Sequence, residues 1–234
     1  INQSLITWLV TSFVWNLGEK KIMDEDFLRF SRDKEYVFLD CETFNLCLNS
    51  CHNLPWQIAM IKVKGDEIIS EKDYHIKWDT HLSISADAAR ITKFNPKLYE
   101  KKALPVEEVF PTIKDWLDKC DYLIGHNFLG FDLYLIKDLY AYMGESYKPL
   151  VNKIIDTNCL ARGIKTDNRY TQDQNLLEYQ YKMYHTRVKG VRTNLSSLGK
   201  EYEIDHDYEK LHDALVDLQL NIKVWNKIKW QVDL

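Results

Sequence analysis

Residues 36–43 have the sequence YVFLDCET, and this stretch decides the fold class. The continuous apolar run from Tyr36 to Leu39 is typical of a buried central strand. Asp40 and Glu42 follow at its end, and side chains alternate along a strand, so both carboxylates point to the same face with Cα atoms about 7 Å apart. Two like charges there repel each other unless a cation neutralises them. Taken alone, the pair also fits an ordinary solvated strand end.

The elements around this strand indicate a mixed sheet. Two extended runs at 56–63 and 67–78, joined by the turn at 64–66, predict a hairpin. The chain then becomes helical, with helices expected at 105–120, 131–143, 195–202 and 214–230 and short strands at 122–124 and 154–156. Strands first, then strands alternating with helices, predict an α/β fold with a mixed five-stranded sheet flanked by helices.

The composition is that of an ordinary folded protein. The 234 residues include 31 Lys and Arg and 35 Asp and Glu, which gives a net charge of −4, and 45% of the residues are hydrophobic. Only eight residues are Gly and five are Pro, which excludes collagen-like and Pro/Gly-rich disordered proteins. The length allows one large domain or two small ones.

Cysteine usage favours a reducing, cytoplasmic compartment. No repeating spacing relates the five cysteines, so a disulfide framework is not expected; they are Cys41, Cys47, Cys51, Cys120 and Cys159. The group formed by Cys47, Cys51 and His52 lacks the fourth ligand that tetrahedral zinc requires. No apolar run reaches the ~18 residues of a membrane-spanning helix, so we expect no membrane association.

Residues 1–33 differ from the rest of the chain, with the apolar segment LITWLVTSFVW at 5–15 and a charged run at 19–26. This stretch also lacks the preceding basic residue of a secretory signal. We therefore divide the chain into an N-terminal helical extension, 1–33, and a domain, 34–234. The extension either packs on the domain's own surface or docks on a polymerase or a second copy, since its aromatic side chains would otherwise face water.

Two later segments carry further candidate ligands. Asp132 begins a helix that follows a short strand, where α/β proteins place their sites, although an acid there also complements the helix dipole. In the sequence HDALVD at 212–217, Asp213 is the candidate N-cap, which leaves His212 on the preceding loop and Asp217 one turn into the helix. Asp213 and Asp217 share a helix face, so the choice of ligand between them stays open.

Together these residues match the needs of two-metal phosphodiester hydrolysis. Hard oxygen ligands hold two Mg²⁺ ions about 4 Å apart, and we expect Mn²⁺ to substitute for them. A general base must take a proton from the attacking water, which histidine does well near neutral pH. His212 is the candidate for this base and His126 the next. The candidate metal ligands are Asp40, Glu42, Asp132 and either Asp213 or Asp217.

The three segments resemble the exonuclease motifs of the DEDDh family, the superfamily of the DNA polymerase III epsilon proofreading subunit, RNase T and oligoribonuclease. The matching motifs are Asp40-Cys41-Glu42-Thr43, Asn127-x3-Phe131-Asp132 and His212-x4-Asp217, and the similarity covers residues 35–230. No Tyr stands four residues before Asp213 or Asp217, which favours the histidine subclass over the tyrosine subclass. The resemblance implies a ribonuclease-H-like fold and 3′→5′ exonuclease activity that releases nucleoside 5′-monophosphates. It also implies His212 as the base and four metal ligands, Asp40, Glu42, Asp132 and Asp217.

Substrate contacts are expected beside the motifs and in one basic stretch. The resemblance implies that Thr43, Phe44 and Asn127 lie next to the substrate. Residues 179–194 contain several cations and interleaved tyrosines without any acid. This pattern suits phosphate contacts and base stacking on a single strand, or simply a solvated loop. The cations that we expect to bind substrate are Arg187, Lys189 and Arg192.

The sequence therefore predicts a 3′→5′ exonuclease acting on single-stranded nucleic acid. DNA is favoured because the motifs are close to the polymerase-associated branch of the superfamily. An exoribonuclease of the same fold is the first alternative. The second, from another class, is a catalytically silent module that binds nucleic acid or a polymerase, which we would expect to have lost an acid or the histidine; none is lost here.

Overall fold

The computed structural model describes residues 27–47, 53–80 and 82–234. Residues 1–26 of the predicted helical extension lie outside the described residues, and so does its predicted role in docking or self-association. Residues 27–33 pack against the end of the chain. The backbone N–H of Leu28 donates to the carbonyl of Leu234 at 2.6 Å, and the Phe30 and Trp230 rings meet edge to face with centroids 5.5 Å apart. The division at residue 33 stays a prediction.

The sheet is mixed, and the described residues form six strands in the order β4-β3-β2-β1-β5-β6. β1 pairs antiparallel with β2, and β2 with β3, whereas β1, β5 and β6 run parallel to one another. The strands are β1 (Glu35–Thr43), β2 (Pro55–Lys64), β3 (Glu67–Lys77), β4 (Leu104–Pro105), β5 (Tyr122–Gly125) and β6 (Ile154–Asp156).

The expected count of five strands was wrong by one. β4 is only two residues long, and it pairs parallel with Ile76 and Lys77 at the edge of β3. Both of its residues are exposed. So short an edge strand has no alternating pattern that a sequence could display, and its Pro105 cannot donate a ladder hydrogen bond.

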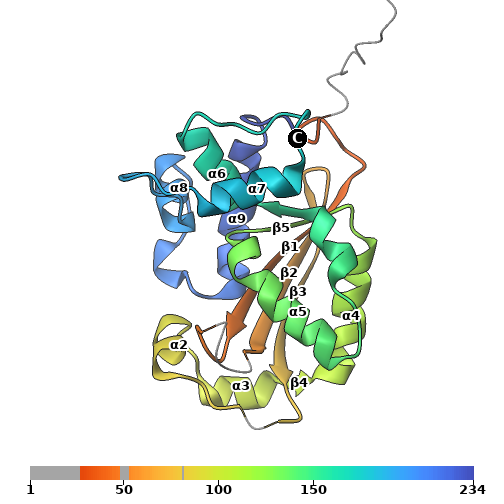
Figure 1. Ribbon diagram of the computed structural model, residues 1–234. Coiled ribbons are helices and arrows are strands. Elements are labelled where there is room, and N and C mark those ends of the chain that lie inside the picture. Colours follow the sequence, from red (N-terminus) through yellow and green to blue (C-terminus); the bar gives the residue numbers. More distant parts are fainter. Residues whose placement is uncertain (1–26, 48–52, 81) are drawn as a thin grey trace, which may run out of the picture.

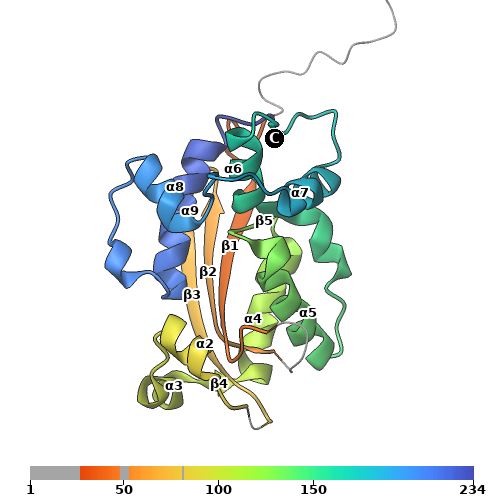
Figure 2. The ribbon, with the colours of Figure 1, turned by 60° about the vertical axis from the view of Figure 1, so that its left-hand side comes forward.

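Helices cover both faces of the sheet (Figure 1 and Figure 2). One face packs against α4 (Val106–Lys119) and α5 (Asp132–Tyr142), and the other against α6 (Thr157–Lys165), α7 (Leu176–His185), α8 (Leu195–Glu201) and α9 (Ala214–Ile228). The smaller helices α2 (Ala86–Ile91) and α3 (Pro96–Lys102) lie near the end of β1. Among the residues described, none of these helices is both long and apolar enough to span a membrane.

The alternation of β1 explains how a single strand serves both layers. Val37 and Leu39 belong to the core beneath α4 and α5, whereas Tyr36 and Phe38 belong to the core beneath α6 to α9. All four are at most 2% exposed. A strand buried on both faces is expected to be apolar throughout, as this one is from Tyr36 until Asp40 interrupts it. Apart from Glu35 at its start, the polar residues of β1 are therefore confined to its carboxyl end.

Helices predicted from apolar periodicity are confirmed, with ends shifted by a few residues. The helices at 105–120, 131–143, 195–202 and 214–230 correspond to α4, α5, α8 and α9. The helix α7 was not expected, because its buried face combines Tyr179 and Met183 with the polar Gln180. The basic stretch at 179–194 is therefore helical as far as His185.

Candidate active site

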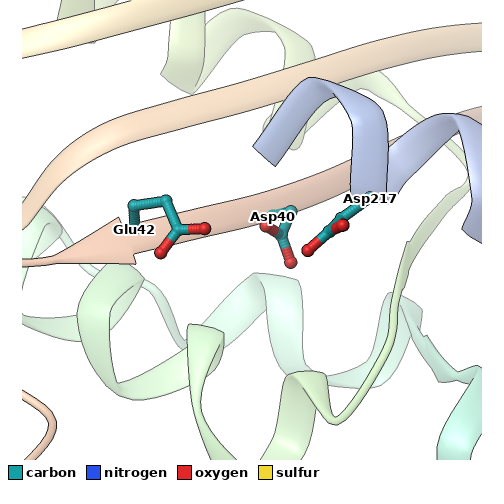
Figure 3. Close-up of side chains that lie close together, drawn as sticks. All are labelled: Asp40, Glu42 and Asp217. Atoms are coloured by element: carbon teal, nitrogen blue, oxygen red, sulfur yellow. The ribbon is translucent and has the colours of Figure 1, made fainter. Parts of the chain in front are cut away.

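Three carboxylates converge near the carboxyl end of β1. Asp40 and Glu42 come from β1 and Asp217 from the first turn of α9, and one ligand oxygen from each lies within 4.8 Å of the other two. Figure 3 shows the carboxyl groups turned toward a common space. The spacing of two residues along the strand places Asp40 and Glu42 on one face, as predicted. The intervening Cys41 belongs to the core on the other face of the sheet.

The fourth predicted ligand, Asp132, is joined to the same strand by its backbone. Asp132 is the first residue of α5 and is 2% exposed. Its Oδ1 accepts a hydrogen bond from the backbone N–H of Cys41 at 2.9 Å. Asp132 thus contacts β1 between Asp40 and Glu42, although it lies outside the tight group of three.

Burial raises the pKa of each carboxyl group in this cluster, and repulsion from the other acids adds to the rise for Asp40 and Glu42. Burial is the main cause for Asp40, whose pKa lies well above its usual range, and the charges of Asp132, Glu42 and Asp217 add to it. Burial also raises the pKa of Glu42 to about 9 and that of Asp132 to about 8. For Asp217 burial raises the pKa to about 6, while a hydrogen bond from the His212 N–H opposes the rise. The cluster favours protons or cations over four bare negative charges.

The start of α9 gives Asp213 and Asp217 different positions. Asp213 is the N-cap, and its carboxylate accepts from the N–H of Leu215 at 3.1 Å and of Val216 at 3.4 Å. Asp217 joins the cluster instead. His212 precedes the cap with a left-handed backbone (φ 70°), and its N–H donates to Asp217 Oδ1 at 3.2 Å. This bond fixes the backbone of His212 while its side chain stays exposed.

The acids line a cavity of about 350 Å³ that is open to solvent. His212 stands at its rim and also borders a neighbouring cavity of about 280 Å³. His126, the second candidate base, lines the acidic cavity too. Its Nδ1 lies 3.0 Å from the Thr157 hydroxyl, and burial lowers its pKa to about 4. The structure therefore brings both histidines and all four predicted ligands to one cavity.

Comparison with known proteins identifies the family to which this chain belongs. Residues 37–225, most of the chain, match the RNase T exonuclease family. The chain belongs to this exonuclease family. The membership confirms the resemblance to the DEDD-type 3′→5′ exonuclease superfamily, and the matched range contains all three acidic motifs.

The similar curated proteins are much longer than this exonuclease domain. DNA polymerase III PolC-type of Mycoplasma pneumoniae is 27% identical over 205 residues, which cover 87% of this chain and 12% of that protein. The protein of the same name from Mycoplasma genitalium is 25% identical over 202 residues, which cover 86% of this chain and 12% of that protein. The chain thus spans about an eighth of the length of these relatives.

Solved structures confirm the ribonuclease-H-like fold. Escherichia coli exonuclease I in complex with a dA16 oligonucleotide matches with a TM-score of 0.67 at 18% identity, over 85% of this chain and 41% of that chain. The zinc-bound form of the exonuclease I–single-stranded DNA complex matches with a TM-score of 0.65, also at 18% identity, over 85% and 41% of the two chains. At this identity the likeness concerns the fold.

The predicted substrate residues beside the motifs have different surroundings. Thr43 and Asn127 line the acidic cavity. Thr43 is 1% exposed, and its hydroxyl donates to the carbonyl of Asn45 at 3.0 Å. Phe44 instead packs edge to face on Tyr99, with ring centroids 5.9 Å apart, and lines a separate cavity of about 190 Å³.

The three predicted cations Arg187, Lys189 and Arg192 are all exposed and follow the end of α7. The guanidinium carbon of Arg187 lies 5.8 Å from the centre of the Tyr184 ring. Of the interleaved tyrosines, Tyr179 is buried, Tyr184 is half-buried and Tyr181 is exposed. Cys51 and His52 lie outside the described residues, whereas the thiols of Cys41, Cys120 and Cys159 are free and buried.

Two residues with structural roles at the site were not predicted from the sequence. Buried Asp156 accepts from the N–H of Asn127 at 3.0 Å and of Leu129 at 3.1 Å, which anchors the turn η2 (Phe128–Gly130) beside the cavity. Lys93 extends its Nζ to the carbonyls of Glu209 at 2.8 Å and Leu211 at 3.1 Å. It thereby holds the loop that leads into His212. Neither role has a local sequence signal, because both depend on segments far apart in the chain.

Proposed function

We propose that this exonuclease-family protein hydrolyses phosphodiester bonds from the 3′ end of single-stranded DNA and releases nucleoside 5′-monophosphates. The observation that carries the proposal is the meeting of Asp40, Glu42 and Asp217 within 4.8 Å, in a solvent-open cavity that also contains Asp132. An acidic cluster of this kind would repel an anionic phosphate by itself. It therefore suits a phosphodiesterase only together with cations.

The residues present fit a pair of divalent metal ions. Asp40, Glu42, Asp132 and Asp217 provide the hard oxygen donors that Mg²⁺ and Mn²⁺ prefer. Burial raises the pKa of each of these groups, so four bare carboxylates without a cation would be electrostatically unfavourable. Bound divalent cations supply Lewis-acid stabilisation of the negative charge that develops on the reacting phosphate.

His212 is the proposed general base. Its side chain is exposed at the rim of the acidic cavity, while its N–H is held by Asp217. The imidazole takes a proton from water as the water oxygen adds to phosphorus. The bond from phosphorus to the 3′-oxygen of the preceding nucleotide breaks, and that oxygen gains a proton from solvent. The released nucleotide keeps the phosphate on its 5′-oxygen.

The names of similar proteins support DNA as the substrate. The curated relatives are PolC-type DNA polymerases, and the exonuclease I structures hold DNA oligonucleotides. We accordingly propose association with a polymerase, and a reducing cytoplasmic location that agrees with the free buried thiols.

The test is digestion of 5′-labelled single-stranded DNA, single-stranded RNA and DNA duplex with Mg²⁺, Mn²⁺ or EDTA. We expect labelled single-stranded DNA to shorten stepwise from its 3′ end with either metal and to stay intact in EDTA. The Asp40→Asn variant, which keeps the side-chain size and removes the charge, should be inactive. Faster digestion of RNA would identify an exoribonuclease, and binding without cleavage would identify a silent module. Full activity in EDTA would exclude the metal mechanism.

A further inference from the structure

A second concave surface, with different chemistry, lies across the turn η2 from the acidic cavity. It is a groove of about 600 Å³ between η2 and α5 on one side and α7 on the other, and we call it the tyrosine groove. Its floor is apolar and includes Leu129, Leu133 and Leu177. Its rings come from Tyr134, Tyr181, Tyr184 and His185.

The rings of the tyrosine groove are arranged for contact with a ligand. Tyr181 is 66% exposed and Tyr134 is 43% exposed, so large aromatic surfaces face solvent. His185 connects two of the tyrosines, with ring centroids 4.5 Å from Tyr181 and 5.1 Å from Tyr184. Exposed rings clustered around an apolar floor are unusual on a surface that contacts only water.

One glycine links the tyrosine groove to the acidic cavity. A Cβ atom at Gly130 would lie 2.5 Å from Cε2 of Tyr184 and 2.6 Å from Oδ1 of Asn127. The missing side chain thus lets Tyr184 lie against η2, beside Asn127, which lines the acidic cavity. Asp156 anchors η2 through two backbone N–H groups, so the ridge between the two surfaces is held in place.

Cations accompany these rings. Lys137 Nζ lies 5.7 Å from the centre of the Tyr134 ring, and the Arg187 guanidinium carbon 5.8 Å from the centre of the Tyr184 ring. Positive groups beside exposed rings complement a polymer of phosphates and bases. Glu178 is the carboxylate of the groove lining, and it would repel such a polymer.

We propose that the tyrosine groove binds the bases of the substrate strand that precede the 3′-terminal nucleotide. The inference rests on the proposed function, because a strand whose 3′ end occupies the acidic cavity must leave it along the surface. The groove lies on the other side of η2 from that cavity, with Tyr184 and Asn127 meeting at Gly130, and it offers stacking surfaces for the next bases. The rings would thereby raise affinity for longer single strands without taking part in hydrolysis.

The experiment compares two substrates that use different parts of the surface. The p-nitrophenyl ester of thymidine 5′-monophosphate requires the acidic cavity alone, whereas oligo(dT) of about 12 nucleotides has the length of typical single-strand sites. The double variant Tyr134→Ala/Tyr181→Ala should hydrolyse the ester at the wild-type rate. Its KM for the oligonucleotide should rise roughly 10- to 100-fold, as expected when base–ring stacks are lost.

Matched variants separate stacking from other causes. Tyr134→Phe/Tyr181→Phe keeps both rings and should retain wild-type KM. Trp230→Ala removes another exposed ring, 56% accessible and outside the groove lining, and should also leave KM unchanged. Glu178→Gln should strengthen oligonucleotide binding at low salt, because it removes a negative charge from the groove. If the natural occupant were instead a basic peptide, Glu178 would attract it, and the same substitution would weaken peptide binding.

Fluorescence anisotropy with labelled oligo(dT) measures the Kd for the strand independently of catalysis. An unchanged KM and Kd in the double Ala variant would overturn the inference, as would weaker binding by Glu178→Gln. If the wild type cleaves neither substrate while the double variant loses affinity, the proposed function fails and the groove assignment stands. If the wild type cleaves the ester but its KM and Kd do not improve with longer oligo(dT), the groove assignment fails and the proposed function stands.

Discussion

The Oδ1 atom of Asp132 accepts a hydrogen bond from the backbone N–H of Cys41 at 2.9 Å. The last parallel pair between β1 and β5 is Phe38 with Ile124, so β1 continues past its neighbour and exposes an unpaired edge. The first residue of α5 satisfies one donor of that edge. A predicted metal ligand therefore also completes the hydrogen bonding of the strand that carries two others.

This double role allows charge and hydrogen bonding to be separated at Asp132. Asp132→Asn keeps an acceptor oxygen and removes the charge, whereas Asp132→Ala leaves the buried Cys41 N–H without its partner. Both variants should be inactive, but the Ala variant should be less stable than the Asn variant by about 1–3 kcal/mol, the usual cost of an unsatisfied buried donor. Urea unfolding in EDTA measures the difference. Equal stability of the two variants would show that the bond contributes nothing.

Divalent cations should stabilise the wild-type protein strongly. Because the acidic cluster is repulsive when empty, Mg²⁺ at about 100 times its dissociation constant should add about 2.7 kcal/mol to the free energy of unfolding. Asp40→Asn should raise the melting temperature in EDTA and reduce the Mg²⁺-dependent increase. Thermal unfolding with and without Mg²⁺ measures both effects. A metal-independent melting temperature in the wild type would contradict the assignment of these carboxylates as ligands.

Loss of the Lys93 contacts should impair catalysis through His212. Lys93→Met removes the donor to the carbonyls of Glu209 and Leu211, so the loop before His212 loses its tether. We expect kcat to fall roughly 10-fold with little change in KM, because small displacements of a catalytic group have effects of this order. His212→Ala should lose roughly 10²–10⁴-fold, the usual contribution of a positioned base.

The pair of variants provides its own control. If Lys93 acts by positioning His212, Lys93→Met should cause no further fall in kcat when His212 is already replaced by Ala, because there is then no imidazole to position. Lys93→Arg should restore part of the rate because it keeps a cationic donor. Additive losses in the double variant would show that Lys93 acts elsewhere.

His126 should make stability decline in acid. Burial lowers its pKa to about 4, and the Arg162 charge adds to this, whereas an unfolded histidine titrates near 6.5. Below pH ~6.5 the unfolded chain binds a proton that the folded chain does not, so the contribution of His126 is lost as the pH falls to about 4. The loss amounts to about 3 kcal/mol. The free energy of unfolding of the wild type, relative to that of His126→Asn, should therefore fall between about pH 7 and pH 4. Urea unfolding at several pH values measures this difference, and a difference that does not change with pH would contradict the prediction.

The exposed cations after α7 should control the salt dependence of binding. Replacing Arg187, Lys189 and Arg192 together with Gln should flatten the slope of log K against log salt for oligo(dT) by about 2, since each phosphate contact on a single strand contributes about 0.7. Hydrolysis of the small p-nitrophenyl ester should not change. A matched triple variant at exposed lysines of other elements, Lys77, Lys97 and Lys227, should keep the original slope.

The sequence predicts those parts of the site that are set by local spacing. The pair in β1 follows from alternation, and the cap at Asp213 follows from helix chemistry, so both could be predicted without coordinates. The family resemblance favoured Asp217 over Asp213. Local spacing could not, because both share a helix face and only packing places Asp217 beside Asp40 and Glu42. Asp156 and Lys93 were missed for the same reason, since their partners lie 27 or more residues away in the chain.

The fold shows the same division between local and distant information. β1, the hairpin of β2 and β3, and the helices α4, α5, α8 and α9 display apolar periodicity and were predicted. α2 and α3 contain six and seven residues and bury almost no apolar side chain, so they lack a pattern. They begin instead at polar caps, Ser85 and Asn95, whose signal is weak without a following apolar face.

The repulsion among Asp40, Glu42 and Asp217 has a consequence for attempts to improve this protein by directed evolution. Each amide substitution in the cluster relieves electrostatic strain and leaves the surrounding packing almost unchanged. A library screened for heat resistance in the absence of divalent ions would accordingly enrich inactive clones carrying Asn or Gln at these positions. Selection for a robust catalyst must therefore score turnover and thermal tolerance in the same round, with metal present throughout.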